Sequence, residues 1–205
     1  ALKKGLLNLE KHLENVKKYN IVPVIAINKF TTDDDAEIEV IREFAAAQNI
    51  KVAVAEVWAK GGKGALELAQ CLIDVVESGK SNFQPLYAWN SPVEEKIATI
   101  AKEIYGANEV EYTAQAKAHL KRITDLGLND LPICMAKTQK SLSDDATLIG
   151  RPTNFSITIR EIEIAAGAGF LVPITGTIMR MPGLPAHPSS EGIDVNEKGE
   201  IVGLF

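Results

Sequence analysis

The sequence predicts an α/β protein in which the end of a doubly wound parallel sheet precedes a smaller mixed α/β domain with antiparallel strands. Helical and strand patterns alternate over roughly the first 80 residues, which is typical of parallel strands joined by helices. The run IVPVIAI, residues 21–27, is apolar throughout, as expected of a strand covered on both faces. From Asn154 the residue pattern changes: FSITIREIEI alternates strictly between apolar and polar residues, which is typical of an antiparallel strand.

The elements of the first part follow from the spacing of apolar residues. An amphipathic opening helix precedes the strand over 21–27, which leads into the polar loop NKFTTDDD. The next helix places apolar residues on one face, namely Ile38, Ile41, Phe44 and Ala45. A strand over 51–57 and a helix over 64–78 complete the unit. Ligands of such sheets bind at the carboxyl ends of the strands.

The segment SGKSNFQP predicts a boundary between a domain over residues 1–80 and a second domain over 81–205. Helices are expected from Ser91 to about Tyr105, and from Thr113 to Leu126. The expected strands cover 131–137, 155–164 and 170–179, and a small hairpin is expected about NEKG. The second domain is therefore predicted to mix helices with antiparallel strands.

Composition narrows the class of protein. The net charge of −5 and the pI of about 5.3 argue against nucleic-acid and anionic-membrane partners. No apolar run approaches the ~20 residues of a membrane span, and no signal-peptide pattern is present. Cys71 and Cys134 stand in apolar runs and are predicted to be buried free thiols, so the expected location is the cytoplasm. Ala1 already lies within a helical pattern, which suggests a piece of a longer protein.

Two short motifs follow the predicted parallel strands. INKF at 27–30 and WAK at 58–60 resemble the base-reading motifs of P-loop GTPases, which places Asn28 and Lys29 near a nucleotide base. Thr31 stands where those proteins carry the guanine-binding aspartate, so adenine is favoured over guanine. Asn28 is alternatively a turn residue that satisfies its own loop.

Other catalytic and metal motifs are not found in the sequence. GGKG is not a phosphate loop, because Val57 and Gly64 stand where that motif needs a glycine and a Ser or Thr. The acidic run from Thr31 to Asp35 could bind a divalent ion, but it is better interpreted as a helix cap at Asp34. The histidines lack ligand spacing and no nucleophile elbow is present, so neither a metal site nor a catalytic residue is predicted.

Phe30 and Trp58 follow the two strands and should reach the same edge of the sheet. Two aromatic rings across a crevice can hold a flat heteroaromatic ring, and each stacking face contributes about 1–3 kcal/mol. Gly61 and Gly62 leave room for close approach, and the lysines of AKGGKG could meet an anionic tail. The alternative is an aromatic pair that covers its own hydrophobic edge.

The polar loop AKTQKSLSDD leaves the strand over 131–137. It could face a ligand through Lys137, Thr138 and Gln139, or it could be an ordinary solvated loop. The sequence leaves these alternatives open.

Long segments resemble the C-terminal part of the formate–tetrahydrofolate ligase family, also called formyltetrahydrofolate synthetase. They include NLEKHLENV, VIAINKF, EVWAKGGKG, MAKTQKSLSDD, GRPTNFSITIREI and AGAGFLVPITGTIMRMPGLP, and they run the length of the chain. The resemblance implies a P-loop-type nucleotide domain and a homotetramer activated by monovalent cations. It also implies that ATP and Mg²⁺ phosphorylate formate, and that formyl phosphate then formylates tetrahydrofolate.

In that family a phenylalanine and a tryptophan enclose the pterin, and these match Phe30 and Trp58. The resemblance thus implies a fragment that supplies the folate slot, with Gly61 and Gly62 beside it. The ATP and Mg²⁺ sites would lie mainly upstream, so the fragment alone is expected to be inactive. The alternative function is a non-catalytic binding module that presents an aromatic slot to a flat ligand.

Overall fold

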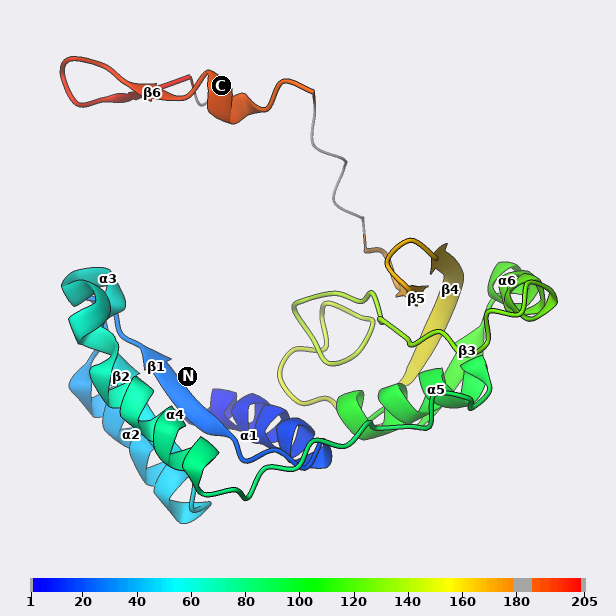
Figure 1. Ribbon diagram of the computed structural model, residues 1–205, viewed down its shortest axis with the longest axis horizontal. Coiled ribbons are helices and arrows are strands. Elements are labelled where there is room, and N and C mark those ends of the chain that lie inside the picture. Colours follow the sequence, from blue (N-terminus) through cyan, green and yellow to red (C-terminus); the bar gives the residue numbers. More distant parts are fainter. Residues whose placement is uncertain (1, 179–185, 204–205) are drawn as a thin grey trace.

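A computed structural model describes residues 2–178 and 186–203 of the chain, and Figure 1 shows the arrangement of its elements. The helices are α1 (Leu2–Lys18), α2 (Asp35–Ala47), α3 (Val57–Lys60), α4 (Leu66–Glu77), α5 (Val93–Thr99) and α6 (Ala114–Asp125). The strands are β1 (Val24–Asn28), β2 (Lys51–Ala55), β3 (Glu109–Tyr112), β4 (Ser156–Ala165), β5 (Phe170–Thr175), β6 (Asp194–Val195) and β7 (Ile201–Val202). Short 3₁₀ turns cover Gly61–Ala65 and Ser189–Glu191, and a π-helical segment covers Ile100–Tyr105.

The first part of the chain is built on two parallel strands. β1 pairs with β2 from Val24 opposite Lys51 to Asn28 opposite Ala55. Helices α1 and α2 lie against one face, where Leu13, Ile25, Ala45 and Ile50 form a small core. Helix α4 packs on β2. The predicted helix–strand alternation is therefore confirmed, and it brings both strand-end loops to one edge.

Two details of that prediction are wrong. The strand over 21–27 begins only at Val24 and is not covered on both faces, because Ala26 is exposed and β1 pairs with β2 alone among the described residues. Helix α4 buries none of its side chains, and Leu66, Leu72, Ile73 and Val76 face solvent. A two-stranded sheet has too little area to cover that apolar face. The described residues therefore show a parallel pair with its helices rather than a complete doubly wound sheet.

The second part contains a mixed three-stranded sheet in the order β3–β4–β5. β3 runs parallel to β4, and β5 runs antiparallel to β4, with a register shift between Ile159 and Glu161. Helices α5 and α6 help to enclose its core of buried residues, which are Val93, Ile97, Ala101, Ala107, Ala116, Leu120, Ile123, Phe155, Ile157, Ile159, Ile162 and Leu171. The predicted antiparallel pairing and the hairpin of β6 and β7 about NEKG are confirmed.

Several expectations for this part need correction. Residues 131–137 form isolated bridges beside β5 at Ile133 and Ala136 instead of a strand. Strand β3 was not predicted, because EVEY is too short and too acidic to give a clear strand pattern. The strand expected over 170–179 ends at Thr175, and Met179 lies outside the described residues. Both cysteines are free, but Cys134 is exposed and Cys71 is only half-buried.

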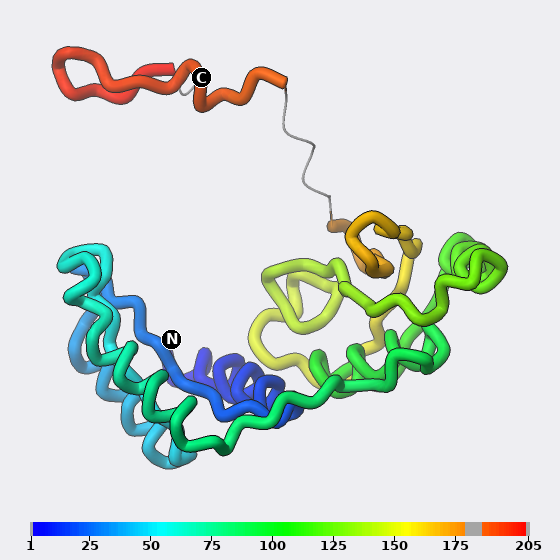
Figure 2. Tube along the Cα trace, in the orientation of Figure 1, coloured from blue at the N-terminus to red at the C-terminus, as the bar shows by residue number. Residues whose placement is uncertain are grey.

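Helix α1 joins the two parts of the chain. Its buried Lys11 donates a hydrogen bond to the Glu103 carbonyl at 2.8 Å, and Asn15 donates to the Ile104 carbonyl at 2.9 Å. These carbonyls belong to the π-helical segment, whose last turn otherwise leaves its acceptors unpaired. Arg151 makes a two-pronged ion pair with Glu14 at 2.9 and 2.8 Å. Figure 2 follows the same trace, with the loop before β4 lying beside α1.

Candidate functional site

The loops after β1 and β2 start side by side at the carboxyl edge of the parallel pair. The Lys29 amide donates to the Ala55 carbonyl at 2.9 Å, which extends the pairing one residue beyond Asn28. Phe30 and Trp58 therefore meet, with ring centroids 6.4 Å apart and ring planes inclined by 46°. The spacing of the two motifs predicted this juxtaposition.

Trp58 lies on the one-turn helix α3, where the sequence predicts a glycine-rich loop. The Glu56 carbonyl accepts hydrogen bonds from the amides of Ala59 and Lys60, and the Glu56 carboxylate pairs with the Lys60 ammonium. The Lys60 ammonium is therefore paired within the turn. Lys63 makes no ion pair within the described residues and is the cation of this loop that remains available.

The glycines of this turn have different roles. A Cβ on Gly64 would lie 2.4 Å from the Glu56 carbonyl oxygen, so the backbone of the turn needs glycine there. The backbone of Gly61 has a φ of +58°, a conformation that residues other than glycine adopt only with strain. A Cβ on Gly62 would meet no atom of residues 2–178 and 186–203 within 4 Å, so this side of Gly62 is open to a ligand.

Aspartates position the loop after β1, which carries Phe30. The Asp33 carboxylate accepts a hydrogen bond from the Phe30 amide at 2.8 Å, and Asp34 caps α2 by accepting from the Ala36 amide at 2.9 Å. The predicted cap is therefore confirmed. Lys29 pairs with Asp35 at 2.6 Å, and this hydrogen bond raises the pKa of Lys29 and lowers that of Asp35. Lys29 is thereby directed toward α2, while Asn28 at the end of β1 is exposed.

Phe30 is 45% exposed and Trp58 is 70% exposed, although large aromatic side chains are usually well buried. A ring held between two parallel rings needs centroids about 7 Å apart, twice the contact distance of carbon atoms. The observed separation is shorter and the planes are tilted, so the two rings contact each other directly. One of the two rings must therefore rotate away from the other to admit a third ring.

A cavity of about 370 Å³ adjoins Lys29 and Glu56 at the same edge. Its ionisable lining is mainly acidic, with Asp35, Glu39, Glu56 and Glu67 against Lys29 and Arg42. Such a lining disfavours a triphosphate and suits a neutral ligand that donates hydrogen bonds.

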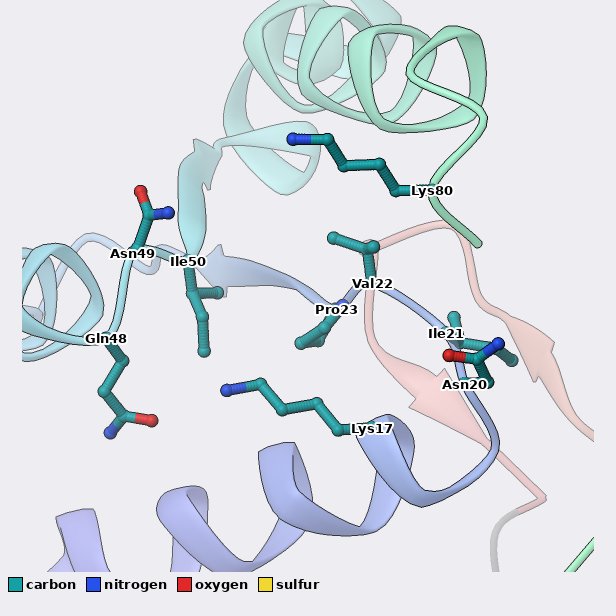
Figure 3. A pocket seen from close by; sticks show the side chains of 9 residues that line it. All are labelled: Lys17, Asn20, Ile21, Val22, Pro23, Gln48, Asn49, Ile50 and Lys80. Carbon is teal, nitrogen blue, oxygen red and sulfur yellow. The ribbon is translucent and has the colours of Figure 1, made fainter. Parts of the chain in front are cut away.

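A second cavity, of about 250 Å³, lies at the opposite, amino edge of the strands (Figure 3). Lys17 and Lys80 extend into it from opposite sides, and Asn20 and Asn49 adopt left-handed backbone conformations beside it. Each asparagine lies just beyond the end of a helix, α1 or α2, and its backbone amide donates a hydrogen bond to a carbonyl of the last turn, that of Lys17 or Ala46. This edge contains none of the predicted site residues.

The loop containing Lys137, Thr138 and Gln139 lines a third cavity, of about 300 Å³, against α1. The Lys137 ammonium donates to the carbonyls of Thr138, at 2.6 Å, and Ser141. It also lies 5.3 Å from the centre of the Tyr105 ring. The predicted loop residues thus share a cavity of their own, apart from the residues that line the one beside Lys29.

No group of three or more His, Cys, Asp or Glu side chains is placed to hold a metal ion within residues 2–178 and 186–203. No helix of these ranges is long and apolar enough to cross a membrane.

The geometry defines an α/β protein that presents aromatic and amide side chains at the carboxyl edge of parallel strands, where enzymes of this class bind small molecules. The sequence model of formate–tetrahydrofolate ligase matches residues 1–205. The chain therefore belongs to the formate–tetrahydrofolate ligase family, whose members use ATP to join formate to tetrahydrofolate.

Sequence reasoning missed residues that support the site. Asp33 fixes the Phe30 backbone, Glu56 holds Lys60, and Tyr105 covers Lys137. The first two carry a local signal, since an aspartate three residues after Phe30 suits a turn and Glu56 precedes Lys60 by one helical turn. Tyr105 has no such signal, because it is 32 positions before Lys137 in the sequence.

Proposed function

We propose that Phe30 and Trp58 form the two walls of a slot for the pterin ring of tetrahydrofolate. The observation that supports this most strongly is that two exposed aromatic rings are neighbours at the carboxyl edge of β1 and β2, with centroids 6.4 Å apart. A rotation of one ring away from the other would open the slot for the pterin. Together with the family, the geometry favours tetrahydrofolate, which has a flat heteroaromatic ring. Gly62 leaves one side of the slot open, and Lys63 could meet the negatively charged glutamate tail.

The chain would act in this ligase as its C-terminal portion and would contribute positioning. Holding the pterin beside formyl phosphate converts a bimolecular step into an effectively unimolecular one. Asn28 and Lys29 would lie near the adenine base. The acidic cavity and the lack of a phosphate-loop motif do not fit the triphosphate, so we assign the ATP phosphates and Mg²⁺ to segments outside these 205 residues.

The remaining predictions follow from the family resemblance: assembly as a homotetramer, activation by monovalent cations, and action in the cytoplasm. The alternative function is a binding module that uses the same slot without catalysis. Formate-dependent ATP turnover by a protein containing this chain distinguishes the ligase from the module.

Titration calorimetry of tetrahydrofolate binding to a ligase that contains this chain tests the slot. Trp58→Ala removes one stacking face and should weaken binding by about 1–3 kcal/mol, a factor of roughly 5–150. Trp89→Ala is the control, because Trp89 is also exposed but lies outside the proposed slot. Equal affinities in the two variants would refute the assignment of Trp58.

A further inference from the structure

We infer that the cavity between α1 and the loop over residues 137–150 binds a phosphate group, either as free phosphate or as part of a small phosphorylated molecule. This site is separate from the pterin slot. Its lining brings Lys137 and Lys140 from the loop together with His12 from α1 and Tyr105 from the π-helical segment.

The charge of the cavity is positive. None of the described residues that line it is acidic: they are Asn8, His12, Tyr105, Lys137, Thr138, Gln139, Lys140, Ser141, Leu142 and Gly150. Carboxylates on the same two segments make hydrogen bonds elsewhere: Glu10 and Glu14 bind Arg151, and Asp144 accepts a hydrogen bond from the Thr158 amide at 2.9 Å. Burial lowers the pKa of Lys137, and the nearby Asp144 carboxylate opposes that shift only in part. In a protein of net charge −5, a cavity that brings Lys137 and Lys140 together, with no acidic side chain in its described lining, favours an anionic ligand.

The loop is held in place before any ligand arrives. Ser141 and Ser143 are buried and their hydroxyls lie 2.9 Å apart, with Ser143 also donating to the Asp145 carbonyl at 2.9 Å. Lys137 uses two of its three N–H donors on carbonyls of the loop and keeps one. The Tyr105 hydroxyl is protonated at neutral pH, as in an ordinary tyrosine, and burial raises its pKa further, to about 12.

The donors favour phosphate over carboxylate. They come from three separate segments, and a tetrahedral oxyanion can accept hydrogen bonds from several directions at once. A planar carboxylate is matched best by the fork of an arginine, and no arginine is among the described residues that line the cavity. Lysine binds phosphate as a point charge. The volume of about 300 Å³ suits a phosphate or a small phosphomonoester.

Calorimetric titration of the 205-residue chain with inorganic phosphate, glycerol phosphate and acetate tests this inference. One saturable phosphate site per chain is expected, and tighter binding of glycerol phosphate would identify a phosphomonoester as the ligand. Lys140→Gln should weaken phosphate by about threefold to fivefold, as for a partly solvated ion pair, and Lys137→Gln by about tenfold or more.

Lys121→Gln on the exposed face of α6 is the matched control and should leave phosphate affinity unchanged. Lys137 also binds two loop carbonyls, so its replacement could loosen the loop, and the thermal unfolding of Lys137→Gln is measured beside the titration. Lys140→Gln tests the site without removing those loop contacts. Absence of saturable binding, equal losses in the Lys140 and Lys121 variants, or acetate binding as tight as phosphate would overturn the inference.

Discussion

The sheet β3–β4–β5 encloses a core of twelve buried hydrophobic residues, whereas the core beside β1 and β2 contains four among the described residues. The larger core lies between the C-terminal sheet and its helices, and the proposed slot lies at the carboxyl edge of the strands beside the smaller core. Its aromatic rings are exposed and are positioned by short-range contacts of Asp33, Glu56 and Gly64. Stability and ligand binding therefore depend on different residues in this chain, and substitutions should separate them.

The largest effect is expected in the C-terminal core. Ile157 is fully buried, so Ile157→Ala should lower the free energy of unfolding by roughly 2–5 kcal/mol through lost burial and a cavity. Ile73 on α4 is 48% exposed, and Ile73→Ala should cost less than about 1 kcal/mol. Urea denaturation measures both. Equal losses would show that the apolar face of α4 is covered in solution, and the contrast between the two cores would fail.

A smaller effect is expected at the turn that presents Trp58. Gly64→Ala should lower the free energy of unfolding by about 1–3 kcal/mol, because the new Cβ would lie 2.4 Å from the Glu56 carbonyl oxygen. The new Cβ of Gly62→Ala would meet no atom of the described residues within 4 Å, so this variant should change stability by less than about 0.5 kcal/mol. If the pterin approaches Gly62, this variant should still lose tetrahydrofolate affinity. A Gly62→Ala protein that is destabilised as much as Gly64→Ala would contradict this division of roles.

The smallest effect concerns the ion pair between Lys29 and Asp35. Lys29 lowers the pKa of Asp35, so the pair contributes stability above the ordinary pKa of an aspartate, near 4, and loses it as pH falls through the lowered value. Asp35→Asn should remove this part of the acid dependence, as should Lys29→Gln. Unfolding midpoints between pH 5 and pH 2 test it. Parallel curves for the parent and both variants would mean that solvent screens the pair completely.

Much of this arrangement could be predicted from the sequence because it depends on local patterns. The apolar run before Asn28 and the helical spacing after it determine where the strand ends, and hence where Phe30 lies. The α3 turn was missed because three glycines in four residues suggest a loop, whereas the hydrogen bonds of Glu56 form a helical turn. The cavity beside Lys137 was also beyond prediction, since it needs Tyr105 and α1 brought together by tertiary packing.

The most direct measurement of the central claim is steady-state kinetics of a ligase that contains this chain, with Trp58→Ala compared with the parent. The tetrahydrofolate KM should rise by a factor of roughly 5–150, whereas ATP-dependent phosphorylation of formate without folate should change little, because that step does not use the pterin. A Trp58→Ala enzyme that folds normally and keeps its tetrahydrofolate KM would contradict the account. Trp58 and Phe30 would then only cover the edge of the sheet.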